Sequence, residues 1–116
     1  LYKKFGINFV NLINGMFSIC IVDEKFDKIF LVRDRFGIKP LYYYHDQKEG
    51  NLIFCSEIKG IVNTSLYKKE MNLREAKIYL KKGFINSTSE TWFKDIYQVQ
   101  DGTYISFDRN KIKKNK

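Results

Sequence analysis

The chain has 116 residues, of which 44% are hydrophobic and 16% are aromatic. This length allows one domain, and this composition excludes intrinsic disorder, because the chain can bury enough apolar surface to offset its ordering entropy. No apolar run approaches the ~20 residues that cross a bilayer, and two cysteines are too few for a disulfide scaffold or a structural zinc site. We therefore expect a cytoplasmic globular protein without membrane contact.

The net charge of +8 raises the question of nucleic-acid binding. Half of the excess lies in residues 108–116, where five basic side chains accompany one aspartate. The basic residues are mostly lysines, whereas the planar fork of arginine is preferred at phosphate-binding sites. We therefore expect no nucleic-acid partner, and we divide the chain into a domain over 1–107 and a basic tail or linker over 108–116.

The first elements are two short helices and two hairpins. Apolar residues recur at helical spacing from Leu1 to Phe9, with Gly6 ending the first helix and Asn8 capping the second. Two hairpins follow, over 16–33 and 41–55, and their four strands are apolar at almost every position. Such strands are typical of a sheet that is buried on both faces.

The remaining elements alternate between helix and strand. Ser56 is a candidate cap for a short helix over 57–62. Asn72 begins a capping-box pattern for a longer helix that ends at Gly83. The Asp101-Gly102 pair predicts a third hairpin, over 96–107. The order of elements indicates an α+β fold with largely antiparallel sheets.

The residues with nucleophilic or acid–base chemistry give no catalytic site. Cys20 and Cys55 lie in apolar strands, which predicts two small buried side chains rather than reactive thiols. His45 lies beside Asp46 in a polar hairpin loop, where we expect a solvated imidazole. We accordingly assign no catalytic, cofactor-binding or metal-binding residue in this chain.

One charged segment lies between the two apolar hairpins. It contains three cations, one carboxylate, a glycine and the only proline of the chain: Arg33, Asp34, Arg35, Gly37, Lys39 and Pro40. Charges between buried strands have to be paired or hydrogen-bonded, because each otherwise costs several kcal/mol. Glycine and proline restrict the path of the backbone. We therefore expect a crossover segment with a defined backbone path and a structural role. We also expect Glu57 to lie close to one of its three cations.

The same segment carries a resemblance to a known family. The matching runs stand in the order and spacing of the glutamine-hydrolysing asparagine synthetases: Asn14 to Phe17, Asp23-Glu24, Arg33 to Tyr43, Ser56 to Lys59, Trp92 to Ile96 and Gly102 to Tyr104. They resemble the C-terminal half of the class II glutamine amidotransferase domain of these enzymes. The family usually carries two prolines where this chain has Gln100 and Asp101.

The resemblance implies an Ntn-hydrolase-like αββα sandwich, here incomplete in its N-terminal part. It also implies hydrolysis of the glutamine side-chain amide, which supplies ammonia for ATP-dependent asparagine synthesis. In the family an N-terminal cysteine is the nucleophile, and an Asn-Gly pair upstream forms the oxyanion hole. Both lie before the point that matches Leu1, so we expect a fragment that is inactive alone.

Partners and cofactors follow from the same resemblance. Glutamine would be the substrate of the complete domain, the rest of the parent chain its partner, and ATP and magnesium would act only in the synthetase domain.

Two alternatives remain open. The chain could belong to another class II amidotransferase, of the glucosamine-phosphate synthase or amidophosphoribosyltransferase type, or it could be a non-catalytic basic interaction module.

Overall fold

The computed structural model describes residues 1–83 and 89–108, together with the backbone of residues 111–115. Helices and strands follow in this order: α1 (Tyr2–Phe5), the 3-10 helix η1 (Gly6–Leu12), β1 (Ser18–Asp23), β2 (Lys28–Arg33), β3 (Tyr42–Asp46), β4 (Asn51–Cys55), α2 (Ile58–Val62), α3 (Leu73–Lys82), β5 (Ile96–Gln98), β6 (Tyr104–Asp108) and β7 (Lys111–Asn115).

The strands form two antiparallel sheets. One has the order β1-β2-β6-β7 and the other has the order β4-β3-β5. Both predicted hairpins are present, with Ser18 opposite Arg33 in the first and Tyr42 opposite Cys55 in the second. The prediction of an α+β fold with antiparallel sheets is confirmed.

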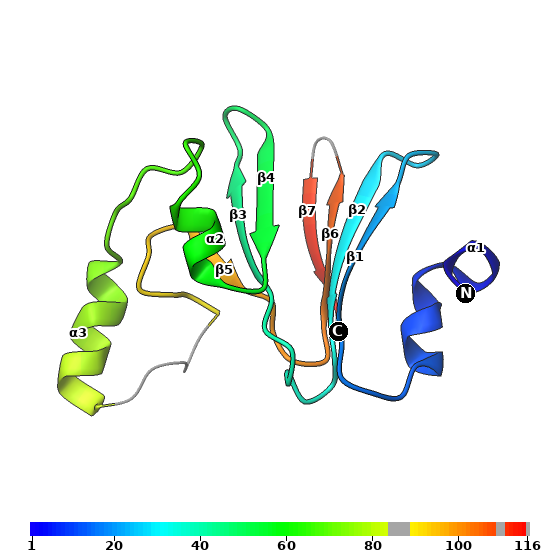
Figure 1. The fold of residues 1–116 in the computed structure, drawn as a ribbon, viewed down its shortest axis with the longest axis horizontal. Helices are drawn as coiled ribbons and strands as arrows, with labels where there is room; N and C mark the ends of the chain where they lie inside the picture. The colour runs from blue at the N-terminus through cyan, green and yellow to red at the C-terminus, as the bar shows by residue number, and fades with distance from the viewer. Residues whose placement is uncertain (84–88, 109–110, 116) are drawn as a thin grey trace.

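The two sheets pack against each other, and helices lie outside them (Figure 1). Leu31 and Phe107 of the four-stranded sheet meet Tyr43 of the other sheet in the larger apolar cluster. A second cluster lies on the far side of the three-stranded sheet, where Ile61 of α2 packs against Ile96. On the opposite flank, the Tyr2 ring of α1 contacts the rings of Phe9 and Phe30. The resulting layers are helix, sheet, sheet and helix.

The strands at the sheet edges are less buried than the sequence predicted. Val22 of β1 is 63% exposed and Phe54 of β4 is 40% exposed. Cys20 and Cys55 are half-buried, not buried. Both strands are the first in their sheet order, so no strand of the described chain pairs with their outer edge.

The predicted third hairpin is wrong. Asp101 and Gly102 do form a turn, with Gly102 at a φ of 64°, but the strands on its two sides separate. β5 pairs with β3 in one sheet, and β6 pairs with β2 in the other. The Asp-Gly pair therefore marks a turn, but the strand on each side of it pairs with a strand of a different hairpin.

Three further expectations need correction. Asn8 lies inside η1 and does not begin a second helix, and Glu57, not Ser56, precedes α2. His45 belongs to β3 and is half-buried, with its ring 5.5 Å from that of Phe107. The division of the chain after residue 107 stays a prediction; the structure has β6 over Tyr104–Asp108, and the backbone of Lys111–Asn115 pairs with it as β7.

Helix α3 begins and ends as the sequence predicted. The Asn72 carboxamide oxygen accepts hydrogen bonds from the backbone N–H of Arg74 and Glu75, and Gly83 ends the helix in the left-handed conformation. Leu73, Ala76 and Leu80 recur along the helix at helical spacing and form an apolar stripe, but its two leucines are not buried. Leu73 is 65% exposed and Leu80 is 82% exposed.

Candidate functional site

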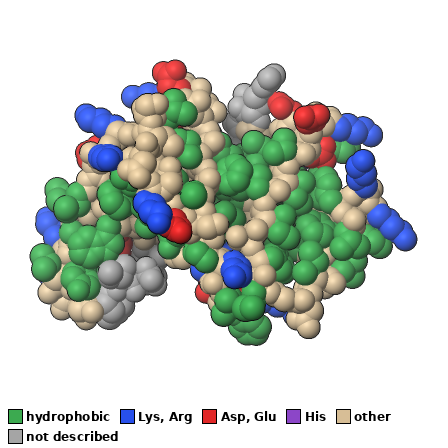
Figure 2. All heavy atoms as spheres, in the orientation of Figure 1, with side chains coloured by type: hydrophobic (Ala, Val, Ile, Leu, Met, Phe, Trp, Pro, Cys, Tyr) green, Lys and Arg blue, Asp and Glu red, His purple; other side chains and the backbone are tan. Residues whose placement is uncertain are grey.

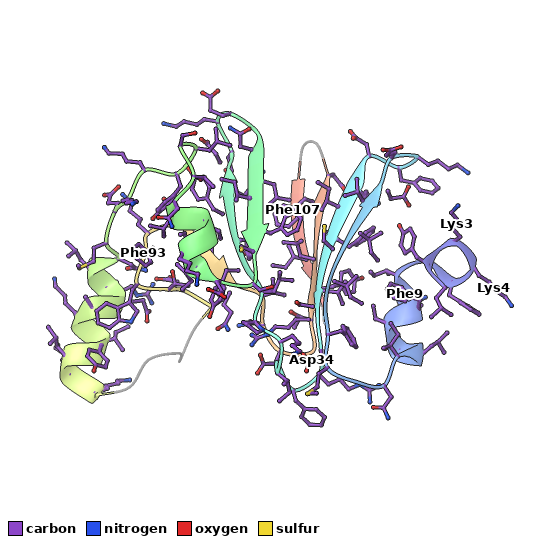
Figure 3. All side chains as sticks on the ribbon, in the orientation of Figure 1. Lys3, Lys4, Phe9, Asp34, Phe93 and Phe107 are labelled. Carbon is purple, nitrogen blue, oxygen red and sulfur yellow. The ribbon has the colours of Figure 1, made fainter. Side chains whose placement is uncertain are left out.

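The chain crosses between its two sheets twice, and the two crossings lie side by side. Residues 34–41 lead from β2 to β3, and residues 99–103 lead from β5 to β6. The Gly102 N–H donates to the Asp34 carbonyl at 2.8 Å, and the Val99 N–H donates to the Leu41 carbonyl at 2.9 Å. We call this part of the molecule, at the base of the sheets in Figure 3 where Asp34 is labelled, the crossing end.

Arg33 joins the two crossings from within. Its side chain is 7% exposed and donates to the carbonyl oxygens of Gly37 at 2.6 Å, Val99 at 2.8 Å and Lys39 at 3.0 Å. The Asp101 carboxylate lies 2.8 Å from Nη1 and supplies the counter-charge. A buried guanidinium is tolerated only where it is paired and hydrogen-bonded, and here both conditions hold.

The Gln98 side chain adds to this arrangement. Its amide oxygen, assigned to face the guanidinium, accepts from Nη1 of Arg33 at 3.2 Å and from Nη2 at 3.3 Å. Gln98 ends β5, so this contact lies directly before the second crossing. The Arg33 guanidinium thus has partners in both crossings and in the strand that leads into one of them.

Asp34 organises the first crossing. Its side chain is almost fully buried, and its carboxylate accepts from the backbone N–H of Phe36 and Ile38 at 3.1 Å each and of Lys39 at 3.0 Å. Burial disfavours ionisation, but the hydrogen bonds from Lys39, Ile38 and Phe36 outweigh it and lower the pKa of Asp34 below its ordinary value. The ionised carboxylate therefore holds the loop in one conformation.

Gly37 is required at the point where the crossings meet. Its φ is 60°, and a Cβ atom built there would overlap the Asp101 carboxylate. Glycine is therefore needed for two reasons, its backbone conformation and the close approach of the second crossing. This agrees with the prediction that the segment is shaped by its glycine.

The structure brings together only some of the residues that the sequence singled out. Arg33, Asp34 and Gly37 meet, and Lys39 contributes its backbone groups. The side chains of Arg35 and Lys39 are exposed, and Pro40 is half-buried at the start of the path into β3.

The expected role of Glu57 is wrong. Its carboxylate is 61% exposed and pairs with Lys59 at 2.5 Å. Among the described residues, the acid that meets Arg33 is Asp101. The Asp101-Gly102 pair indicates only a turn, and a turn signal does not show which distant strand lies beside it.

The two cysteines lie in surroundings that differ from those of a reactive thiol. Burial raises the pKa of Cys20, which disfavours its thiolate. A Cβ atom at Gly60 would overlap the Cys55 sulfur, so this thiol lies closely against α2. Within the described ranges, no three His, Cys, Asp or Glu side chains are grouped so as to hold a metal ion. The helices seen there are all too short or too polar to cross a bilayer.

Comparison with known proteins identifies the family. The sequence matches the glutamine amidotransferase domain family along residues 1–116, and the chain belongs to this family. It is 42% identical over 112 residues to the glutamine-hydrolyzing asparagine synthetase 2 of Bacillus subtilis (strain 168). It is 38% identical over 113 residues to a protein of Methanocaldococcus jannaschii whose name also refers to glutamine-hydrolyzing asparagine synthetase. It is 32% identical over 105 residues to amidase chry2 of Gibberella zeae.

These matches cover most of this chain but little of the relatives. They span 93% of the chain and 15% of the Bacillus protein, and 96% of the chain and 21% of the Methanocaldococcus protein. For amidase chry2 the shares are 90% and 15%. The chain therefore spans about one-fifth or less of the length of the relatives that it matches.

Proposed function

We propose that this chain forms part of the glutaminase domain of an asparagine synthetase-type enzyme. In that role the complete domain hydrolyses the side-chain amide of glutamine to glutamate and ammonia, and the ammonia is used for ATP-dependent asparagine synthesis. The observation that carries the proposal is the 42% identity to the Bacillus asparagine synthetase over 93% of the chain, together with the family match over residues 1–116.

The layered structure supports the same proposal. Glutaminase domains of this class have the αββα sandwich of the Ntn hydrolases, and the chain has two antiparallel sheets packed face to face between helices. At the crossing end, the Arg33–Asp101 ion pair and the hydrogen bond from the Gly102 N–H to the Asp34 carbonyl join the two crossings between the sheets. We propose that these residues position the sheets rather than contact glutamine.

The chemistry of this enzyme class requires a cysteine thiolate that attacks the amide carbon and forms a thioester. Neither cysteine of this chain suits the step, since Cys20 has a raised pKa and Cys55 lies against α2. The nucleophile would then come from a part of the parent protein outside these 116 residues. ATP and Mg²⁺ would likewise act in the synthetase part of that protein.

The test compares the 116-residue chain with the complete polypeptide that carries it. Each is incubated with glutamine, and glutamate and ammonia are measured. We expect turnover by the complete polypeptide and none by the 116-residue chain. Absence of glutaminase activity in the folded complete polypeptide would refute the proposal.

A second assay identifies the acceptor of the ammonia. The complete polypeptide is supplied with glutamine, aspartate, ATP and Mg²⁺, and asparagine is measured. Asparagine formation supports the asparagine synthetase type. Glutamate release without asparagine would instead favour another class II amidotransferase, which would be tested with sugar-phosphate and phosphoribosyl acceptors.

A further inference from the structure

Large apolar side chains are exposed on the surface of the crossing end. The exposed fractions are 60% for Leu12, 63% for Met16, 82% for Phe36 and 54% for Ile38. Leu12 and Phe36 line the same cavity of about 400 Å³. The Phe17 carbonyl accepts from the Asp34 N–H at 2.9 Å, which brings the segment of Met16 to the start of the first crossing. We call Leu12, Met16, Phe36 and Ile38 the crossing-end patch.

The space-filling view shows hydrophobic side chains at this end of the molecule. Hydrophobic atoms project from the lower end of the molecule in Figure 2, at the place where Asp34 is labelled in Figure 3. Exposed apolar side chains that gather at one end of a molecule mark an interaction site more often than isolated exposed leucines do.

Hydrogen bonds to a buried side chain fix the backbone of the crossing-end patch. The buried Asp34 carboxylate accepts hydrogen bonds from the backbone N–H of both Phe36 and Ile38. The two side chains are therefore presented outward by a backbone that is already ordered. Binding to such a surface loses little further conformational entropy, and rigid aromatic anchors are typical of the centre of an interface.

The surroundings of the patch indicate the chemistry of its partner. Arg35 and Lys39 are exposed on the same crossing, on either side of Phe36 and Ile38. An interface with an apolar centre and charged groups at its edge is the usual arrangement. The partner surface should therefore be apolar at its centre and should carry carboxylates at its edge.

The position of β7 indicates which molecule supplies that surface. β7 pairs with β6 so that Asn115 lies opposite Tyr104, beside the second crossing. A polypeptide that continues from β7 would leave the sheet at the crossing end, and a domain tethered there has a high effective concentration at the patch. The relatives of this chain are long enough to include such a domain, since the chain covers 15% and 21% of two of them.

We propose that the crossing-end patch docks onto a following domain of the same polypeptide, which covers Phe36 and Ile38. This inference rests on the proposed function, in which ammonia passes from the glutaminase domain to a second domain. It adds the residues that make the contact and the chemistry of the opposing surface.

The experiment is site-specific photocrosslinking in the complete polypeptide. The photoreactive amino acid p-benzoylphenylalanine replaces Phe36, and in a matched control it replaces Leu80, which is equally exposed at 82% but lies on α3. We expect position 36 to crosslink within one polypeptide to residues that follow residue 116, with a yield at least about tenfold above that of position 80.

Three results would overturn the proposal. These are crosslinks from position 36 to a second copy of the chain, equal labelling from positions 36 and 80, or no protein crosslink from position 36. The readout needs no glutamine, so a failed docking is distinguished from a failed glutaminase assay on the same sample.

A pair of variants gives an independent measurement. Phe36→Ser with Ile38→Ser should raise the rate of limited proteolysis directly after β7 by about tenfold, because an undocked domain leaves its connection open. Leu73→Ser with Leu80→Ser, on the exposed stripe of α3, should leave that rate unchanged. Equal rates in the two double variants would contradict the proposal.

Discussion

The crossing end and the region around α3 both contain ion pairs between charged side chains, but these pairs lie in different surroundings. At the crossing end the side chain of Arg33 is 7% exposed, and Asp34 is almost fully buried. Around α3, Arg74 pairs with Glu90 at 3.2 Å and Lys94 pairs with Glu70 at 2.9 Å, and three of these four side chains are at least half exposed. The comparison shows which polar contacts determine the fold.

The contribution of each kind of contact to stability depends on whether water can reach the groups that are left when the contact is broken. When a surface ion pair is broken, water solvates both partners, so such pairs typically contribute less than about 1 kcal/mol. When a buried carboxylate is removed, the N–H groups that it satisfied are left without any acceptor, and each such group costs about 1–3 kcal/mol. We therefore expect substitutions at the crossing end to be the more destabilising.

The largest expected effect is that of Asp34→Ala. The substitution leaves the buried side of the first crossing without an acceptor for the N–H groups of Phe36, Ile38 and Lys39. We expect the free energy of unfolding to fall by about 3 kcal/mol, measured by urea denaturation.

A matched control for this substitution is Asp46→Ala. The Asp46 carboxylate also accepts from backbone N–H groups, those of Lys48 and Glu49, but in an exposed turn. Its loss should cost less than about 1 kcal/mol, because water reaches those groups. Equal losses at the two positions would show that burial is not what distinguishes the crossing end.

The pH dependence of stability gives a second measure of Asp34. Its pKa is lowered in the folded chain, so its ionised form is favoured by folding. The contribution is fully present above the unfolded pKa of about 3.9 and is lost as the pH falls through the lower folded value. Asp34→Asn should remove this contribution, so the difference in unfolding free energy between the wild type and the variant should shrink as the pH is lowered from 5 to 2. A difference that does not change with pH would contradict the assignment.

Gly37→Ala should produce the next largest effect. Its φ of 60° disfavours a side chain, and the new Cβ atom would overlap the Asp101 carboxylate. We expect a loss of about 2 kcal/mol in the unfolding free energy. Gly50→Ala isolates the backbone contribution, because Gly50 has a φ of 72° with no atom within 4 Å of the added Cβ.

The unfolding free energy lost in Gly37→Ala beyond that lost in Gly50→Ala measures the cost of the close approach between the two crossings. Combining Gly37→Ala with Asp101→Ala should recover part of that excess, because the overlapping carboxylate is gone. If the double variant is as unstable as the sum of the two single variants, the overlap with Asp101 is not the cause.

These two regions also show what the sequence could predict. Asn72 and Gly83 define both ends of α3, since the signals for starting and stopping a helix lie within a few residues of it. The first two hairpins were predicted for the same reason, because each pairs segments that are adjacent in the chain. Local patterns therefore located the first four strands and α3 correctly.

Contacts between distant segments were harder to predict. The sequence indicated that the crossover charges had to be paired or hydrogen-bonded, and Arg33 is both. The acid expected near one of the three cations was Glu57, however, whereas Arg33 pairs with Asp101. The choice depends on how two hairpins and two later strands arrange into two sheets. The same limitation explains the exposed stripe of Leu73 and Leu80, since periodicity shows that a helix has an apolar face but not what covers it.

The smallest effect is expected at α3, for Asn72→Ala. The Asn72 side chain accepts from the N–H of Arg74 and Glu75 and donates to Glu90 at 3.0 Å, at a helix end that water can reach. Its removal should lower the unfolding free energy by about 1 kcal/mol, and should speed amide hydrogen exchange in the first turn of α3. Asn8→Ala is the control, because Asn8 was predicted to be a cap but lies inside η1, and we expect a change within about 0.5 kcal/mol. An Asn72 effect as large as that of Asp34→Ala would mean that the α3 region is as closely tied to the core as the crossing end.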